Sequence, residues 1–105
     1  QSPELRMIHI YFDIALTTEQ GLKLYRKELY DLIITDMGRG DESNAGITLI
    51  KELNFLHCQV PIVVYCSMTA MQRYADEAIR LGAYRVVDGI ANITSLITDI
   101  CGLSK

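Results

Sequence analysis

The sequence has little of what marks a secreted, metal-clamped or membrane protein. Its three cysteines are odd in number and none form a C-x-x-C pair, so neither a disulfide framework nor a zinc site is expected. No apolar run reaches the ~18 residues that a membrane-spanning helix needs, and no signal peptide is visible. We therefore expect a cytoplasmic protein without a membrane partner.

Clustered positive charge is also missing. The formal net charge is −3, and the lysines and arginines are scattered singly along the chain. Because neutralising a phosphate backbone requires clustered cations, direct binding to nucleic acid is not expected.

What the chain does contain is the pattern of one α/β domain. Its 105 residues are 50% hydrophobic, and short apolar runs alternate with amphipathic stretches, as in βα units on a parallel sheet. A short helix is expected near residues 2–8, with strands at 10–16, 32–35, 62–65 and 85–87 and helices between and after them. The uninterrupted apolar run at 32–35 is typical of a central strand that is covered on both faces.

Local signals set the expected helix ends. Thr17 with Gln20 forms a possible capping box, which starts a helix at Thr18. Thr69 and Asn92 are expected to cap the last two helices. Gly82 is expected to end the helix before the last strand.

Chemistry-bearing residues follow three of these strands. Asp36 ends the second strand, Cys66 and Ser67 follow the third, and Asp88 follows the last. In an open parallel sheet, ligands bind at the carboxyl ends of the strands. A carboxylate at Asp36 can act there as a nucleophile or a metal ligand, and the alternative is a hydrogen bond within the turn.

Several stretches of the chain are similar to a known family. Tyr30-Asp-Leu-Ile-Ile-Thr-Asp-Met, Pro61-Ile-Val-Val-Tyr-Cys-Ser and Leu81-Gly-Ala-Tyr-Arg-Val-Val resemble, in order and spacing, three conserved stretches of bacterial response-regulator receiver domains. The resemblance covers roughly residues 10–100. It implies a flavodoxin-like fold, a three-layer α/β sandwich with a parallel sheet.

The resemblance also implies a function. A receiver is not an enzyme in its own right: it accepts a phosphoryl group from a histidine kinase or phosphotransfer protein, here on Asp36, and then switches its protein contacts. Magnesium would be held by Asp36, by the backbone carbonyl of Gly38 and by an acidic pair after the first strand. The expected output is a change in dimer or partner contacts through the last two helices and the last strand, with a homodimer as one of the two forms.

The chain departs from the receiver pattern in several places. The family's first strand and the acidic pair that follows it are absent from this sequence. Residues 1–105 are therefore interpreted as a single, N-terminally incomplete domain. Cys66 stands where the family has a switch Thr or Ser, and Ser67 is the nearest hydroxyl. Gly89 replaces the family's lysine, with Asp88 before it, and Arg39 in the active-site loop offers a cation.

Three functions remain open from the sequence. The first is a phosphorelay receiver that uses Asp36, with Cys66 and Ser67 as phosphoryl contacts. The second is a pseudo-receiver that acts as a protein-interaction or dimerisation module without phosphorylation. The third is an enzyme of the same fold that binds flavin or a small phosphate, although no glycine-rich phosphate loop follows the first expected strand.

Overall fold

The computed structural model describes residues 13–38 and 43–100, in which helices and strands alternate along the chain. The order within these residues is α1 (Thr18–Lys27), β1 (Ile33–Asp36), α2 (Ala45–Phe55), β2 (Ile62–Tyr65), α3 (Met68–Arg80), β3 (Arg85–Val87) and α4 (Ile90–Ile100). The expected α/β class is therefore confirmed.

The described strands form one parallel sheet in the order β1-β2-β3. Asp36 at the end of β1 lies opposite Tyr65 of β2, and Tyr65 lies opposite Val87 of β3. Residues 62–64 of β2 are buried, as expected for a strand covered on both faces.

One strand position differs from expectation. The apolar run at 32–35 was predicted to be central, but within the described residues β1 is an edge strand, and Ile34 is 39% exposed. The sequence shows that the run is apolar, whereas its place in the sheet depends on which strands are present to pair with it.

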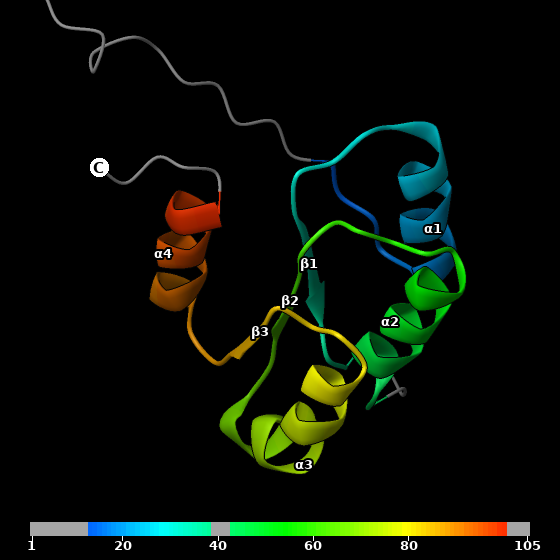
Figure 1. Ribbon diagram of the computed structural model, residues 1–105. Helices are drawn as coiled ribbons and strands as arrows, with labels where there is room; N and C mark the ends of the chain where they lie inside the picture. Colours follow the sequence, from blue (N-terminus) through cyan, green and yellow to red (C-terminus); the bar gives the residue numbers. More distant parts are fainter. Residues whose placement is uncertain (1–12, 39–42, 101–105) are drawn as a thin grey trace, which may run out of the picture.

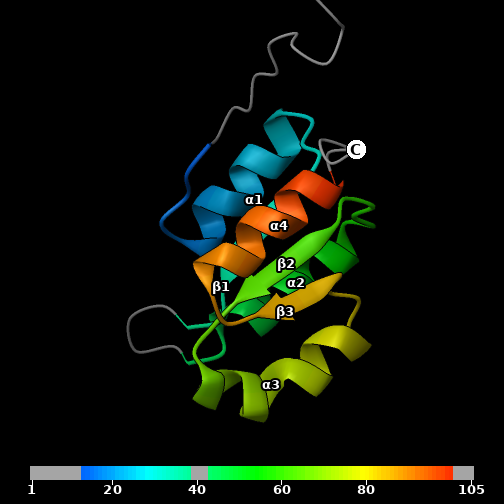
Figure 2. The same ribbon diagram turned by 90° about the vertical axis from the view of Figure 1, so that its left-hand side faces the viewer.

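The helices cover the two faces of the sheet unequally. α1 and α2 lie on one side of the sheet and α4 lies on the other (Figure 1). Seen from the side in Figure 2, α4 crosses in front of the strands while α2 lies behind them. α2 packs on β1 and contacts both α1 and α3, and α3 also packs on β3.

The core lies between α2 and the sheet. The largest fully buried side chains come from α2, β2 and the residue that follows β1: Met37, Ile47, Ile50, Leu53, Val63 and Val64. The apolar residues of α2 therefore recur at the helical spacing that places them on the face that it buries.

Two of the predicted helix signals are confirmed. α1 begins at Thr18, and the Thr17 hydroxyl accepts a hydrogen bond from the Gln20 backbone N–H at 3.1 Å. Gly82 follows the end of α3 with a φ of +112°, a backbone conformation that favours glycine.

Two predicted caps are wrong. The hydroxyl that caps α3 belongs to Ser67, which accepts a hydrogen bond from the Ala70 N–H at 3.1 Å, and Thr69 lies inside the helix. Asn92 likewise lies inside α4, where its N–H donates to the carbonyl of Gly89 at 3.1 Å. Both helices begin directly after the preceding strand and turn. They therefore start before Thr69 and Asn92, the residues that the sequence suggested as caps.

The expected strand at 10–16 is not formed in its described part. Residues 13–16 carry no strand, and residues 10–12, like the helix expected near 2–8, lie outside the described residues. A strand exists only where a neighbour completes its hydrogen bonds, and no described strand lies next to residues 13–16.

Candidate functional site

The carboxyl ends of the strands bring the predicted residues to one edge of the sheet. Asp36 is level with Tyr65 and Val87 across the three strands, so Cys66 and Asp88 each come one residue later on the neighbouring strands. The Cys66 N–H donates to the Val87 carbonyl at 2.9 Å, which holds these two strand ends together. The register of the three strands therefore places Asp36, Cys66, Ser67 and Asp88 at the same edge of the sheet, as the sequence indicated.

Asp36 is exposed between two buried neighbours, Thr35 and Met37. Side chains alternate between the faces of a strand, so burial of the two neighbours on the α2 side directs Asp36 to the opposite face. The Met37 N–H donates to the Tyr65 carbonyl at 2.9 Å, and the Thr35 hydroxyl donates to the Asp36 carbonyl at 3.0 Å. The backbone of Asp36 is thus fixed while its carboxylate remains accessible.

Gly46 holds the start of α2 against this strand end. Its N–H donates to the Met37 carbonyl at 2.7 Å. A Cβ atom at this position would lie 2.9 Å from the Asp36 carbonyl oxygen and 3.0 Å from the Met37 Cα. Both neighbours are backbone atoms that cannot move aside, so glycine is required for this approach.

Cys66, predicted as a phosphoryl contact, is a buried thiol that is 6% exposed. Burial raises the pKa of the Cys66 thiol, and the negative charge of Asp88 raises it further. The thiol therefore stays protonated at neutral pH, and a protonated thiol is a weak hydrogen-bond donor and a poor nucleophile.

Ser67 is exposed and is better suited to contact a ligand. Its oxygen accepts the Ala70 N–H as the cap of α3, which uses one lone pair. A hydroxyl also carries one proton to donate, and no described residue accepts it. The cap fixes the side chain at the edge that Asp36 shares.

The described residues do not by themselves make the expected magnesium site. Asp36 provides one carboxylate and Gly38 one backbone carbonyl, and residues 13–38 and 43–100 contain no group of three or more acidic, His or Cys residues placed to hold a metal. Magnesium in proteins is usually held by one or two carboxylates together with waters and phosphate oxygens. Arg39, the predicted cation of the loop, lies outside the described residues, and Asp88 is exposed.

A groove next to Asp36 was not anticipated from the sequence. Its volume is about 620 Å³, and it lies between β1 and residues 13–17, with side chains of α1 and α2 at its base. Asp13 and Asp36 both line it. The sequence signal for such a groove is weak. It consists of two largely apolar segments, 13–16 and 32–36, that have no third strand segment between them in the sequence.

Comparison with known proteins identifies no relative. No protein-family model matches the chain, and no curated protein matches it. No helix in the described parts of the chain combines the length and apolar character needed to cross a bilayer.

Proposed function

We propose that this chain is a receiver-like signalling domain of flavodoxin-like fold that accepts a phosphoryl group on Asp36 and then changes its protein contacts. The observation that carries the proposal is an accessible carboxylate at the carboxyl end of a parallel strand, between two buried residues that fix its backbone. The donor is a histidine kinase or a phosphotransfer protein.

The proposed transfer needs little from the protein beyond position and charge. A carboxylate oxygen of Asp36 attacks the phosphorus of a phosphohistidine, so a P–O bond forms and the P–N bond breaks. The imidazole nitrogen leaves with the bonding electrons and takes up a proton, and Asp36 becomes an acyl phosphate. Ser67 is the described hydroxyl at this edge that can donate to a phosphoryl oxygen.

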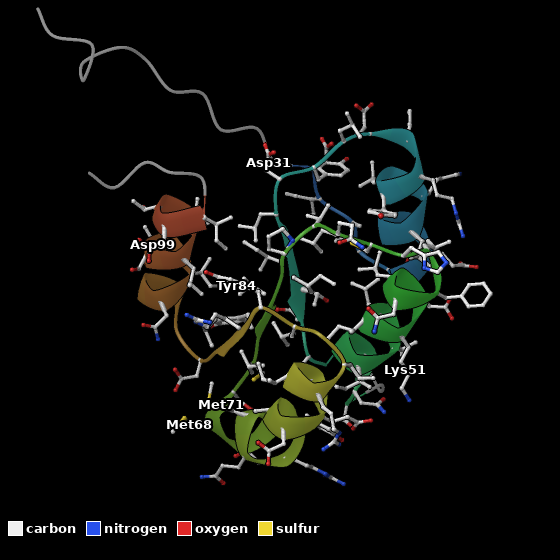
Figure 3. The ribbon with its side chains drawn as sticks, viewed as in Figure 1. Asp31, Lys51, Met68, Met71, Tyr84 and Asp99 are labelled. Atoms are coloured by element: carbon white, nitrogen blue, oxygen red, sulfur yellow. The ribbon has the colours of Figure 1, made fainter. Side chains whose placement is uncertain are left out.

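The proposed output surface is formed by α3, β3 and α4. Met68, Ile79 and Tyr84 on this part of the chain are 58%, 50% and 42% exposed. Figure 3 shows Met68 and Met71 near the start of α3, on the same side of the molecule as α4, with Tyr84 between the two helices. Exposed methionine and aromatic side chains suit a protein contact, and the proposed output is a change in the contacts of this surface with a second copy or with a partner protein.

A second candidate is favoured by the charges at the same edge. Asp88 adds negative charge beside Cys66, and Cys66 is a buried thiol where phosphoryl binding would be helped by a hydroxyl. Both features weaken a phosphate site. The second candidate is therefore a pseudo-receiver that uses the α3–β3–α4 surface for constitutive binding without phosphorylation.

A titration with beryllofluoride and magnesium, followed by amide NMR, separates the two candidates. The phosphoryl-accepting domain is expected to show shifts at Asp36, Met37 and Ser67 that are lost in Asp36→Asn. Asp31→Asn is the matched control, because Asp31 is an exposed aspartate before the start of the same strand. Shifts that persist in Asp36→Asn, or an unchanged wild-type spectrum, would reject phosphorylation and leave the constitutive module.

A further inference from the structure

A hydrogen bond joins the loop after Asp36 to the helix that carries part of the proposed output surface. The hydroxyl oxygens of Ser43 and Tyr74 lie 3.0 Å apart, although the two residues are 31 positions apart in the chain. Ser43 precedes α2, at the far end of the loop that begins after Asp36, and Tyr74 lies in the middle of α3. The contact therefore links this loop to α3 directly, without passing through the sheet.

The two sides of this hydrogen bond are placed by different parts of the fold. Tyr74 is half-buried, and its side chain packs against the hydrophobic core. Ser43 is exposed, and among the described residues the Asn44 side chain makes no hydrogen bond that caps α2. The chain is fixed again at Gly46, whose N–H donates to the Met37 carbonyl at 2.7 Å. Core packing thus places the Tyr74 hydroxyl, whereas the loop places Ser43.

The helix α3 is attached to the surroundings of Asp36 at a second point. Ser67 follows β2, and its oxygen accepts the Ala70 N–H at 3.1 Å as the cap of α3. Tyr74 lies about two helical turns farther along the same helix. One attachment comes from the segment after β2 and the other from the segment after β1, so both neighbouring strand ends contribute to the position of α3.

We infer that the hydrogen bond between Ser43 and Tyr74 couples the conformation of the loop after Asp36 to the position of α3. Through α3 it reaches the exposed side chains of Met68 and Ile79. The coupling acts as a signal only if a phosphoryl group is added to Asp36, and in that respect it rests on the proposed function. Such a group brings roughly two negative charges to the start of this loop.

The coupling is reciprocal. If the loop biases the position of α3, then α3 biases the loop by the same free energy. A change made at Tyr74 is therefore expected to be felt at the carboxyl end of β1, and a change made at Ser43 is expected to be felt in the middle of α3. A contact that only adds stability would show neither effect beyond its own neighbourhood.

Amide NMR with hydrogen exchange on the free chain tests this reciprocity. Tyr74→Phe removes one hydroxyl and keeps the ring in the core, and it is expected to shift the amides of residues 36–38. Ser43→Ala removes the other hydroxyl and is expected to speed exchange at residues 71–75 by about two- to fivefold. The double variant is expected to match the single variants rather than sum their effects, because all three lose the same contact.

Two further variants serve as controls. Tyr84→Phe removes a hydroxyl from an exposed tyrosine of the same surface that has no hydrogen-bond partner in the described part of the chain, and it is expected to leave residues 36–38 unshifted. Ser43→Thr retains a hydroxyl at the loop and is expected to restore wild-type exchange at residues 71–75. This rescue separates loss of the hydrogen bond from a general effect of substitution at Ser43.

The role of the contact in signalling is tested by adding beryllofluoride and magnesium to the same proteins. In the wild-type chain we expect shifts at Asp36 that extend to residues 71–79, and in Tyr74→Phe we expect the shifts at Asp36 alone to remain. Shifts in α3 that are equal in the two proteins would overturn the signalling role. An absence of any shift at Asp36 would reject phosphorylation, not the coupling.

Results on the free chain decide the coupling whatever beryllofluoride does. It is overturned if each substitution affects only the residues next to it, if the effects of Ser43→Ala and Tyr74→Phe are additive, or if Tyr84→Phe shifts residues 36–38 as much as Tyr74→Phe does. The coupling and the phosphorylation of Asp36 can therefore fail separately.

Discussion

At the scale of single residues, two helix ends have the same hydrogen bonds but different side chains. After α2, the N–H groups of His57 and Cys58 donate to the carbonyls of Asn54 and Leu53. After α3, Gly82 and Ala83 make the equivalent bonds to residues 79 and 78. Both ends are Schellman motifs, and the residue with positive φ is Gly82 in one and His57, at +59°, in the other.

His57→Gly is therefore expected to stabilise the protein. A left-handed backbone conformation costs a non-glycine residue roughly 1–2 kcal/mol, and the greater freedom of glycine in the unfolded chain offsets part of the gain. We expect the free energy of unfolding to rise by about 0.5–1 kcal/mol, measured by urea denaturation.

Gly82→Ala is the matched control for the His57 prediction. A Cβ at Gly82 would meet only the Asn54 side chain at 3.9 Å, so the substitution adds strain without a clash. It is expected to lower the free energy of unfolding by about 1 kcal/mol. A His57→Gly protein no more stable than wild type would mean that the end of α2 is not held in this conformation.

Cys66 gives the stability a pH dependence. The pKa of its thiol is raised by burial and by Asp88, so the folded protein retains a proton that the unfolded chain releases above about pH 8.5. The contribution is complete below that pH and is lost as the pH rises toward the higher pKa of the folded state. We expect the free energy of unfolding, measured by urea denaturation, to fall over the pH interval above about 8.5.

Cys66→Ala is expected to reduce this pH dependence, whereas Cys58→Ala, at a half-buried thiol, is the control for loss of a cysteine. An equal slope in wild type and Cys66→Ala over that interval would show that the thiol does not carry the effect.

At the scale of elements, the ends of the helices are set by local chemistry only where the turn before them is short and unambiguous. Thr17 and Gln20 were correctly identified because both partners of the cap lie within four residues. Ser67 was missed as the cap of α3 because Thr69 is an equally good capping residue by type. The choice between them depends on where β2 ends, which is fixed by its pairing with β1 and β3.

Ser67→Ala is expected to lower the free energy of unfolding by about 1 kcal/mol, because the Ala70 N–H loses its acceptor at the start of α3. Thr69→Ala, an exposed position inside the helix, is expected to change it by less than about 0.5 kcal/mol. Thermal denaturation of the two variants checks this order. The opposite order would restore Thr69 as the cap.

At the scale of the whole molecule, the sequence predicts the α/β class, the parallel sheet and the position of Asp36. Each follows from runs of adjacent residues, such as the apolar stretch that ends at Asp36 and the Pro61 that precedes β2. The sequence does not predict that residues 13–16 form no strand or that β1 lies at an edge, because both depend on which strand is present between them. The groove beside Asp36 is a consequence of that missing neighbour.

The candidate site is predictable to the same extent. The strand ends place Asp36, Cys66 and Asp88 at one edge, as their positions after three strands indicated. Burial of Cys66 and the use of Ser67 as a helix cap depend on packing between α3 and the sheet, which no short stretch of sequence contains.

Incubation of the chain with acetyl phosphate and magnesium, followed by intact-mass analysis, tests the central claim most directly. We expect one added phosphoryl group on the wild-type chain and on Asp31→Asn, none on Asp36→Asn, and its loss on treatment with hydroxylamine, which cleaves acyl phosphates. A wild-type chain that gains no phosphoryl group, or an Asp36→Asn chain that still gains one, would contradict the claim that Asp36 is the acceptor.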